Sequence, residues 1–280
     1  MKIEFSKYEA LGNDFLVIDG GKNRLSKSRL GKLATGICNR RCGVGADGIL
    51  YLSKSNGLDT KADVFNADGS WAEKSGNGLR ITAVHLGRSR KSRTQFRILM
   101  GGEKSLVTLG KQITGGFMVT AELGRPEFRT SRVPVKCRSK YLINGPIKIG
   151  RQRLIATCLA IGNPHTVISV DDFDFDWKAL GRELEHAPIF PRGTNVEFVK
   201  VLSASKLRVN DWERGAGATG SSGTGAAAAV CAMVTAGRAN RKCEVRFEKG
   251  SLHVDWNADD NLIRLTGPVR HVMTGYYTWD

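Results

Sequence analysis

NADGSWAEKSGNGLR, residues 66–80, has a counterpart further along the chain in ERGAGATGSSGTGAAAA, residues 213–229. Each stretch contains Ser-Gly-x-Gly and then continues into helix-forming residues. Serine is a preferred N-cap because its hydroxyl accepts a backbone N–H of the first helical turn. The two stretches therefore predict helices that begin just after Ser75 and Ser222.

Further landmarks accompany both loops in the same order. LGNDFLVID and IGNPHTVISV each place Gly-Asn, at Asn13 and Asn163, before a strand-like apolar run. GVGADGILYL follows in the first half and GTNVEFVKV in the second. Asn66 and Glu213 then stand equally far before their serines. Because the intervals are nearly equal, we interpret the chain as a duplication rather than a coincidence among its 33 glycines.

A duplicated chain of 280 residues predicts two similar lobes. We expect the first lobe to span residues 1–118 and to include a C-terminal return over residues 269–280. The second lobe is expected to span residues 119–268. Matching loops of two similar lobes usually face each other, so we expect a binding site in the cleft between them.

The pattern of apolar residues predicts an α+β protein. IEFSKYEALGNDFLVID indicates two strands around a turn, and SKSRLGKLATGICNR indicates an amphipathic helix capped by its first serine. Residues 96–123 alternate and turn in the manner of a β-meander. Further strands are predicted in LIATCLAIGNPHTVISV, TNVEFVKVLS, KLRVNDWER, CEVRFEKGSLHVDW and NLIRLTGPVRHVM.

Composition indicates a globular protein, with 41% hydrophobic and 25% charged residues. No apolar run approaches the ~20 residues of a membrane span, and the N-terminus lacks a signal-peptide core. Six cysteines are scattered rather than arranged as a disulfide framework or at zinc-ligand spacing. We therefore expect a cytoplasmic protein with free thiols, no metal and no membrane partner. Cys42 is interpreted as a packing residue.

The formal net charge of +16 raises nucleic-acid binding as a possibility. The basic residues are spread along the chain, and the densest cluster is LGRSRKSRTQFR, residues 86–97. A solvated basic face is the more ordinary interpretation, so a nucleic-acid partner is not expected. The positive field favours an acidic small molecule instead.

The glycines beside the two serines indicate chemistry beyond helix capping. Ser75-Gly76-Asn77-Gly78 and Ser222-Gly223-Thr224-Gly225 leave backbone N–H groups accessible at a helix N-terminus, where anions bind. Two such loops suit a substrate carboxylate and the negative charge that develops on it during reaction. Plain capping remains the alternative for each serine taken alone.

Polar residues at the repeated landmarks suit an amino-acid ligand. Asparagine amides can bind its ammonium and carboxylate groups, Glu213 can bind an ammonium, and Arg214 can form a bidentate pair with a carboxylate. His165 is a candidate for proton relay. Each of these residues could instead brace a turn.

The ordered motifs resemble those of the diaminopimelate epimerase family. They are LGNDF, GVGADGI, FNADGS, SGNGLR, GNPH, GTNVEFV, ERGAG, GTGA and the closing GPVRHVMTGYY, and they cover almost the whole chain. The resemblance implies two pseudo-symmetric lobes, each a β-sheet wrapped around a central helix. It implies interconversion of LL- and meso-diaminopimelate in lysine biosynthesis, without pyridoxal phosphate or any other cofactor, and a homodimer.

In this family two bases on opposite faces of the substrate Cα remove and deliver a proton, one as a thiolate and one as a thiol. Ser75 and Ser222 stand at the positions of those two cysteines, with His165 and Glu213 as further catalytic candidates. The resemblance assigns substrate binding to the side chains of Asn13, Asn66, Asn163, Asn195, Glu213 and Arg214 and to the backbone of Gly76, Asn77, Gly223 and Thr224.

The two serines are the departure from the family pattern. A cysteine thiol has a pKa near 8.5 that a helix N-terminus lowers, whereas a serine hydroxyl stays protonated unless a neighbouring base activates it. Three interpretations follow: an epimerase whose cysteines were replaced, a homologue with altered chemistry such as a racemase, dehydratase or one-base isomerase, and a non-catalytic amino-acid-binding protein.

Overall fold

The structure is a computed structural model that describes residues 1–21, 24–90, 92–150 and 152–279. Among these residues the chain forms a mixed α+β fold with four helices. It divides into two compact units, Met1–Glu122 with Thr266–Asp280 and Leu123–Leu265. We call them unit 1 and unit 2 and describe each by itself.

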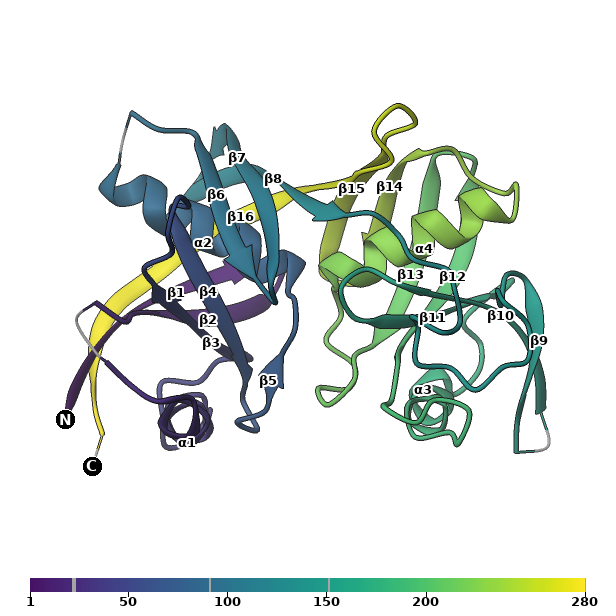
Figure 1. The fold of residues 1–280 in the computed structure, drawn as a ribbon, viewed down its shortest axis with the longest axis horizontal. Helices are drawn as coiled ribbons and strands as arrows, with labels where there is room; N and C mark the ends of the chain where they lie inside the picture. Colours follow the sequence, from purple (N-terminus) through teal and green to yellow (C-terminus); the bar gives the residue numbers. More distant parts are fainter. Residues whose placement is uncertain (22–23, 91, 151, 280) are drawn as a thin grey trace. The chain divides into compact units, whose positions relative to one another are not determined.

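Unit 1 is a β-sheet closed around one helix, α2 (Figure 1). The strand order is β1-β2-β3-β4-β6-β7-β8-β16, and β16 also pairs with β1. Its elements are β1 Lys2–Ala10, β2 Asn13–Asp19, α1 Lys27–Ile37, β3 Gly48–Ser53, β4 Thr60–Asn66, β5 Trp71–Ala72, α2 Gly76–Ser89, β6 Gln95–Met100, β7 Glu103–Ile113, β8 Gly116–Gly124 and most of β16 Ile263–Thr278.

Unit 2 repeats the arrangement around α4 with the order β15-β14-β13-β12-β11-β10-β9. Its elements are β9 Gly145–Ile149, β10 Gln152–Ala160, β11 Pro164–Ser169, α3 Trp177–Glu185, β12 Asn195–Ser203, β13 Lys206–Trp212, α4 Gly223–Thr235, β14 Lys242–Phe247 and β15 Gly250–Trp256. Helix α4 is apolar on all sides and packs against β10 to β15, as expected for a central helix.

Matching parallel crossovers in the two units reflect the sequence repeat. β2 and β3 pair in parallel across α1, and β4 and β6 across α2. β11 and β12 pair in parallel across α3, and β13 and β14 across α4. Each serine loop therefore enters the central helix of its unit from a strand, which places the helix N-terminus beside the strand ends.

The sequence prediction of an α+β fold with two sheet-wrapped helices is confirmed. Ser26 caps α1 as expected, since its side chain accepts from the backbone N–H of Arg29. Helix α3 was not predicted, although Asp176 caps it by accepting from Ala179 N and is an N-cap signal in the sequence. No helix among the described residues is long and apolar enough to span a membrane.

Candidate functional site

Ser75 caps α2 in unit 1. Its backbone is extended, and its Oγ accepts from the Gly78 backbone N–H at 3.0 Å. Gly78 has no room for a side chain, because an added Cβ would lie 2.9 Å from Leu50 Cδ2 and 3.1 Å from Ser75 Cβ. Gly76 and Asn77 supply the first N–H groups of the helix, which have no acceptor within the helix. The loop thus has the geometry of an anion site.

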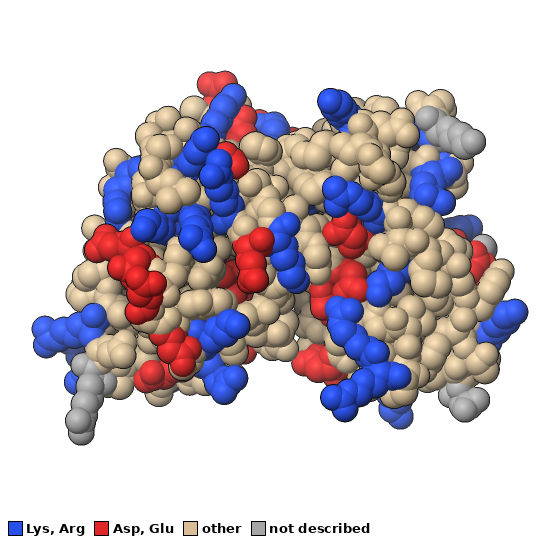
Figure 2. Space-filling model, turned by 180° about the vertical axis from the view of Figure 1, so that it is seen from behind, with Lys and Arg blue, Asp and Glu red and all other residues tan. Residues whose placement is uncertain are grey.

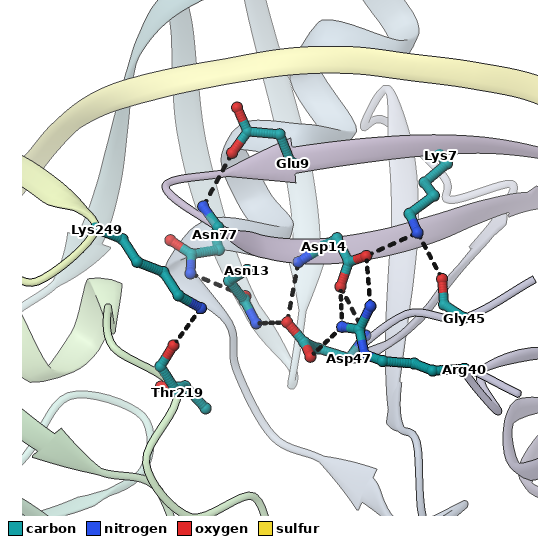
Figure 3. Close-up of polar contacts among 11 residues, drawn as sticks. Lys7, Glu9, Asn13, Asp14, Arg40, Gly45, Asp47, Asn77, Thr219 and Lys249 are labelled. Atoms are coloured by element: carbon teal, nitrogen blue, oxygen red, sulfur yellow. Dashed lines mark hydrogen bonds and ion pairs between the residues drawn. The ribbon is translucent and has the colours of Figure 1, made fainter.

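An amide chain joins this loop to the start of β2. Asn77 Nδ2 donates to Asn13 Oδ1 at 2.9 Å, and Asn13 Nδ2 donates to Asp47 Oδ2 at 2.8 Å (Figure 3). Both asparagines are buried. The Arg80 guanidinium on α2 in turn donates to Asn77 Oδ1. Because each amide is bonded through both its oxygen and its nitrogen, the orientation of the Asn13 and Asn77 side chains is fixed.

Cationic side chains pair with the carboxylates next to these amides. Asp14 lies 2.8 Å from Lys7 Nζ and 2.6 Å from Arg40, and Arg40 also contacts Asp47 at 2.8 Å (Figure 3). Burial opposes ionisation of Asp14, but hydrogen bonds from Arg40 and Lys7 outweigh it and hold its pKa below the ordinary value. Asp14 is therefore ionised and paired with both cations.

Asn66 lies apart from that network. Its Nδ2 donates to Ser70 Oγ at 3.0 Å within the turn that follows β4. Its backbone N–H also bonds within the turn, to the Ser70 carbonyl. The contact of Asn66 in this structure is therefore that of a turn-bracing residue.

Ser222 caps α4 in unit 2 and has a carboxyl neighbour. Its Oγ accepts from Gly225 N at 3.2 Å and donates to Glu213 Oε2 at 3.2 Å. Ser222 is buried, and the carboxyl group of Glu213 is enclosed although the residue as a whole is partly exposed. Burial, followed by the nearby Asp211 charge, raises the pKa of Glu213 to about 8. This raised pKa favours the protonated Glu213 carboxyl near neutral pH.

His165 is fully buried in a second cluster of unit 2. Its Nδ1 lies 2.6 Å from Glu197 Oε1, and its Nε2 lies 2.9 Å from Asn163 Oδ1. Asn163 Nδ2 then donates to Thr224 Oγ1 on α4 at 3.4 Å. Within unit 2, the described contacts of His165 do not reach Ser222. The histidine fixes Asn163, which fixes the first turn of α4.

Asn195 and Arg214 hold the loop before the helix. Asn195 Nδ2 donates to the Pro164 carbonyl at 2.8 Å, and its Oδ1 accepts from Arg214 N at 2.9 Å. Arg214 Nη1 donates to the Arg192 carbonyl at 3.2 Å. Asn195 is buried, so both halves of its amide bind backbone groups here.

The repeated landmarks make equivalent contacts. Asn13 contacts the second residue after Ser75, which is Asn77, and Asn163 contacts the second residue after Ser222, which is Thr224. This agreement ties each Gly-Asn turn to the helix N-terminus of its own unit.

Sequence reasoning missed several carboxylates and hydroxyls of unit 2. Asp211 and Glu197 are buried, and Thr219 contacts both Asp211 and Glu213. A signal was present in KLRVNDW, where strand alternation directs Leu207, Val209 and Asp211 to the same side. An acidic residue on the apolar side of a strand indicates a buried carboxyl group.

Other features of the described residues bear on cofactors and surface. They contain no group of three or more His, Cys, Asp or Glu that could hold a metal ion. All six cysteines are free, and Cys42 is exposed, so its interpretation as a packing residue is wrong. Figure 2 shows Lys and Arg interspersed with Asp and Glu on the face drawn. In the basic cluster at residues 86–97, Lys91 lies outside the described residues.

Comparison with known proteins follows the landmark pattern. The family profile described as diaminopimelate epimerase matches residues 5–128 and 157–272. Diaminopimelate epimerase of Gloeothece citriformis is 36% identical over 99% of this chain and 99% of its own length. The enzyme of Carboxydothermus hydrogenoformans is 38% identical over 98% of this chain and 99% of its own. The chain belongs to the diaminopimelate epimerase family.

Solved structures extend the similarity of the fold to more distant proteins. A probable proline racemase from Agrobacterium radiobacter has a TM-score of 0.75 at 13% identity, covering 99% of this chain and 93% of its own. A hydroxyproline epimerase from Agrobacterium vitis has a TM-score of 0.75 at 13% identity, covering 98% and 92%. The fold of this chain is thus similar to those of the probable proline racemase and the hydroxyproline epimerase.

Proposed function

We propose that this chain binds diaminopimelate and interconverts its LL and meso forms by cofactor-independent proton transfer at Cα, at a rate limited by Ser75 and Ser222. The observation that carries the proposal is the pair of serine-capped helix N-termini at the positions of the family's two bases. Membership of the diaminopimelate epimerase family supports the substrate class, which is a small amino acid.

Recognition of the substrate would use the amides and backbone groups of the two loops. Asparagine amides and helix-terminal N–H groups suit carboxylates, and Glu213 suits an ammonium group when it is ionised. The proposed binding residues are Asn13, Asn66, Gly76, Asn77, Asn163, Asn195, Glu213, Arg214, Gly223 and Thr224. Their contacts in the structure hold Asn13, Asn77 and Asn163 in defined orientations.

The two serines differ in their access to a base. Glu213 lies 3.2 Å from Ser222 Oγ and can accept its proton once Glu213 itself is ionised. Within unit 1, the described hydrogen bond of the Ser75 hydroxyl is the one it accepts from Gly78 N, which is not a base, and the other described contacts of Ser75 are made by its backbone. This asymmetry favours a second candidate function: one-base chemistry, such as a dehydratase or a one-base isomerase, at the Ser222 side. A non-catalytic amino-acid-binding protein remains the third class.

The test is Cα–H exchange of LL- and meso-diaminopimelate in deuterated water, followed by NMR. The double variant Ser75→Cys/Ser222→Cys is expected to exchange about 10² to 10⁴ times faster than the unmodified chain, because thiols replace poor acid–base groups. Rapid exchange by the unmodified chain would overturn the limiting role of the serines. A double variant that binds diaminopimelate without exchanging it would overturn the epimerase assignment.

We also propose that the protein is a cytoplasmic homodimer that binds no nucleic acid. Six free cysteines support a reducing compartment, and Lys and Arg are interspersed with Asp and Glu on the face drawn in Figure 2. Sedimentation equilibrium tests the dimer. Titrations with diaminopimelate, proline derivatives and an RNA oligonucleotide test the ligand, and steeply salt-dependent RNA binding would contradict the proposal.

A further inference from the structure

One hydroxyl in unit 2 is shared between two carboxyl groups. Thr219 Oγ1 lies 2.5 Å from Asp211 Oδ2 and 2.6 Å from Glu213 Oε1. These are short contacts between oxygen atoms, and each needs a hydrogen between its two oxygens. Glu213 continues the series to Ser222 Oγ at 3.2 Å. The four side chains form an unbroken row from the cap of α4 into the interior of unit 2.

Counting hydrogens shows that the row holds an extra proton. Thr219 has one hydroxyl hydrogen and can donate it to only one carboxylate at a time. The second contact must be donated by a protonated carboxyl group to the Thr219 oxygen. Either Glu213 or Asp211 is therefore a carboxylic acid whenever both contacts are present.

The charges around Asp211 work in the same direction. Asp211 is 1% exposed and pairs directly across the β12–β13 ladder with Glu197, which is also buried. His165 Nδ1 on β11 lies 2.6 Å from Glu197 Oε1, and Lys249, in the turn between β14 and β15, donates to the Thr219 carbonyl (Figure 3). Asp211, Glu197 and Glu213 thus gather their carboxyl groups in one part of unit 2.

The shared proton is stabilised mainly by burial. Burial raises the pKa of Asp211 to about 6, with the Glu197 charge adding to the effect. Among the described residues, Asp211 Oδ1 and Glu197 Oε2 are buried without a hydrogen-bond partner. Ionising all three acids would leave buried negative charge without enough donors, which is costly.

We propose that Asp211 and Thr219 are positioning residues that hold one proton jointly with Glu213 and pass it along their row. When the proton on Glu213 Oε1 moves to Thr219 Oγ1, the Thr219 hydroxyl proton moves to Asp211 Oδ2. One O–H bond breaks and one forms at each transfer, and the total charge is unchanged. Asp211 becomes the acid and Glu213 the carboxylate, which can then accept the Ser222 proton. The link to catalysis rests on the proposed function, whereas the shared proton does not.

The experiment is a pH titration of the full chain, without substrate, by NMR of ¹³C-labelled side-chain carboxyl groups. In the unmodified protein, Glu213 is expected to titrate well above an ordinary glutamate. Asp211→Asn removes a like charge and should move the Glu213 midpoint down by about one pH unit or more. Thr219→Val should abolish the coupling between Asp211 and Glu213, and Thr219→Ser should retain it.

Thr157→Val is the matched control, because Thr157 is a buried hydroxyl of unit 2 whose contact is the Asn144 backbone N–H. It should leave both carboxyl titrations unchanged. A Glu213 midpoint that is ordinary in the unmodified chain, or unaltered by Asp211→Asn and Thr219→Val alike, would overturn the proposal. If one variant fails to fold, the other gives the same readout.

A second measurement tests whether the row of side chains takes part in the reaction. In the Ser75→Cys/Ser222→Cys background, Thr219→Val should shift the pH profile of kcat/KM for diaminopimelate exchange, and Thr219→Ser should restore it. An unshifted profile would overturn the relay. Failure of the double-cysteine chain to exchange diaminopimelate would contradict the proposed function, while the substrate-free titration would still decide the shared proton.

Discussion

The Ser75 loop of unit 1 and the Ser222 loop of unit 2 share a turn, a cap and an asparagine contact, but their charged surroundings differ. Behind Ser75, Asp14 and Asp47 pair with Lys7 and Arg40. Behind Ser222, carboxyl groups gather and share a proton through Thr219. The repeat thus preserved backbone geometry while the electrostatics of the two halves diverged, so one serine has a titratable neighbour in its unit and the other has paired ions.

The central helices show the same divergence. Arg80 of α2 is completely buried and donates to Asn77 Oδ1 and the Pro268 carbonyl, whereas the equivalent position of α4 is Ala227. Burial lowers the pKa of Arg80 to about 10, which still leaves it charged at neutral pH. Unit 1 therefore carries a buried cation in its central helix where unit 2 carries a methyl group.

The largest expected effect comes from restoring one thiol at a time. Ser222→Cys alone should raise Cα–H exchange of diaminopimelate by about 10²-fold, because Glu213, once it is ionised, can accept the thiol proton. Ser75→Cys alone should give a smaller gain. Equal gains, measured by deuterium incorporation into each epimer, would show that the Ser222–Glu213 contact has no chemical consequence.

Removing the buried cation is expected to have the next largest effect. Arg80→Met should lower the free energy of unfolding by about 2–3 kcal/mol, because Asn77 Oδ1 and the Pro268 carbonyl lose a charged donor. Urea unfolding followed by circular dichroism measures the change. Ala227→Ser serves as the control in α4, and a loss as large there would contradict the special role of Arg80.

The opposite pKa shifts predict opposite pH dependences of stability. Glu213 has a raised folded-state pKa, so its contribution is complete below its unfolded value of 4.5 and is lost as pH rises toward about 8. The free energy of unfolding should therefore fall less in Glu213→Gln than in the unmodified protein between pH 5 and pH 8.5, by about 1–2 kcal/mol. Urea midpoints at the two pH values give the result.

Asp14 provides the reverse case for comparison. Its folded-state pKa is lowered, so its contribution is present above the unfolded value of 3.8 and is lost as pH falls through the folded value. Asp14→Asn should destabilise the protein at neutral pH, where it leaves Lys7 and Arg40 without this partner. If the stability of the Glu213 and Asp14 variants changed with pH in the same direction relative to the unmodified protein, the electrostatic difference between the units would be contradicted.

The smallest expected effect on stability is that of Asn66→Ala. Its side chain bonds to Ser70 Oγ in an exposed turn, so the loss should stay below about 1 kcal/mol. Binding of diaminopimelate, followed by calorimetry, should weaken tenfold or more if Asn66 contacts the ligand (~1.4 kcal/mol). An unchanged affinity would remove Asn66 from the proposed site.

Much of the fold and part of the candidate site could be predicted because their signals are local. Ser75 and Ser222 cap helices as glycine-flanked serines do, and the Gly-Asn turns precede strands at Asn13 and Asn163. The repeat also singled out Glu213 in the sequence, whereas its contact with Ser222 came from the structure. These features depend on residues close together in the chain or on equal spacing in two copies.

The remaining features required distant residues to come together. The contact of Arg80 with the Pro268 carbonyl could not be predicted from sequence spacing. The same holds for the pairing of Glu197 with Asp211 in the β12–β13 ladder. His165 was a candidate for proton relay, and its neighbours in unit 2, Glu197 and Asn163, became visible only in the fold.

The sequence by itself determined the family, the two serine-capped helices and the sheet around each, since these follow from short-range propensities and a repeated order of motifs. The tertiary structure alone decided the protonation of the Ser222 side. A pKa depends on burial and on charges brought close through space, and Asp211, Thr219 and Glu213 meet only because β13 and the following loop fold back beside α4. Ser75 and Ser222 look alike in the sequence, and their surroundings make them chemically different.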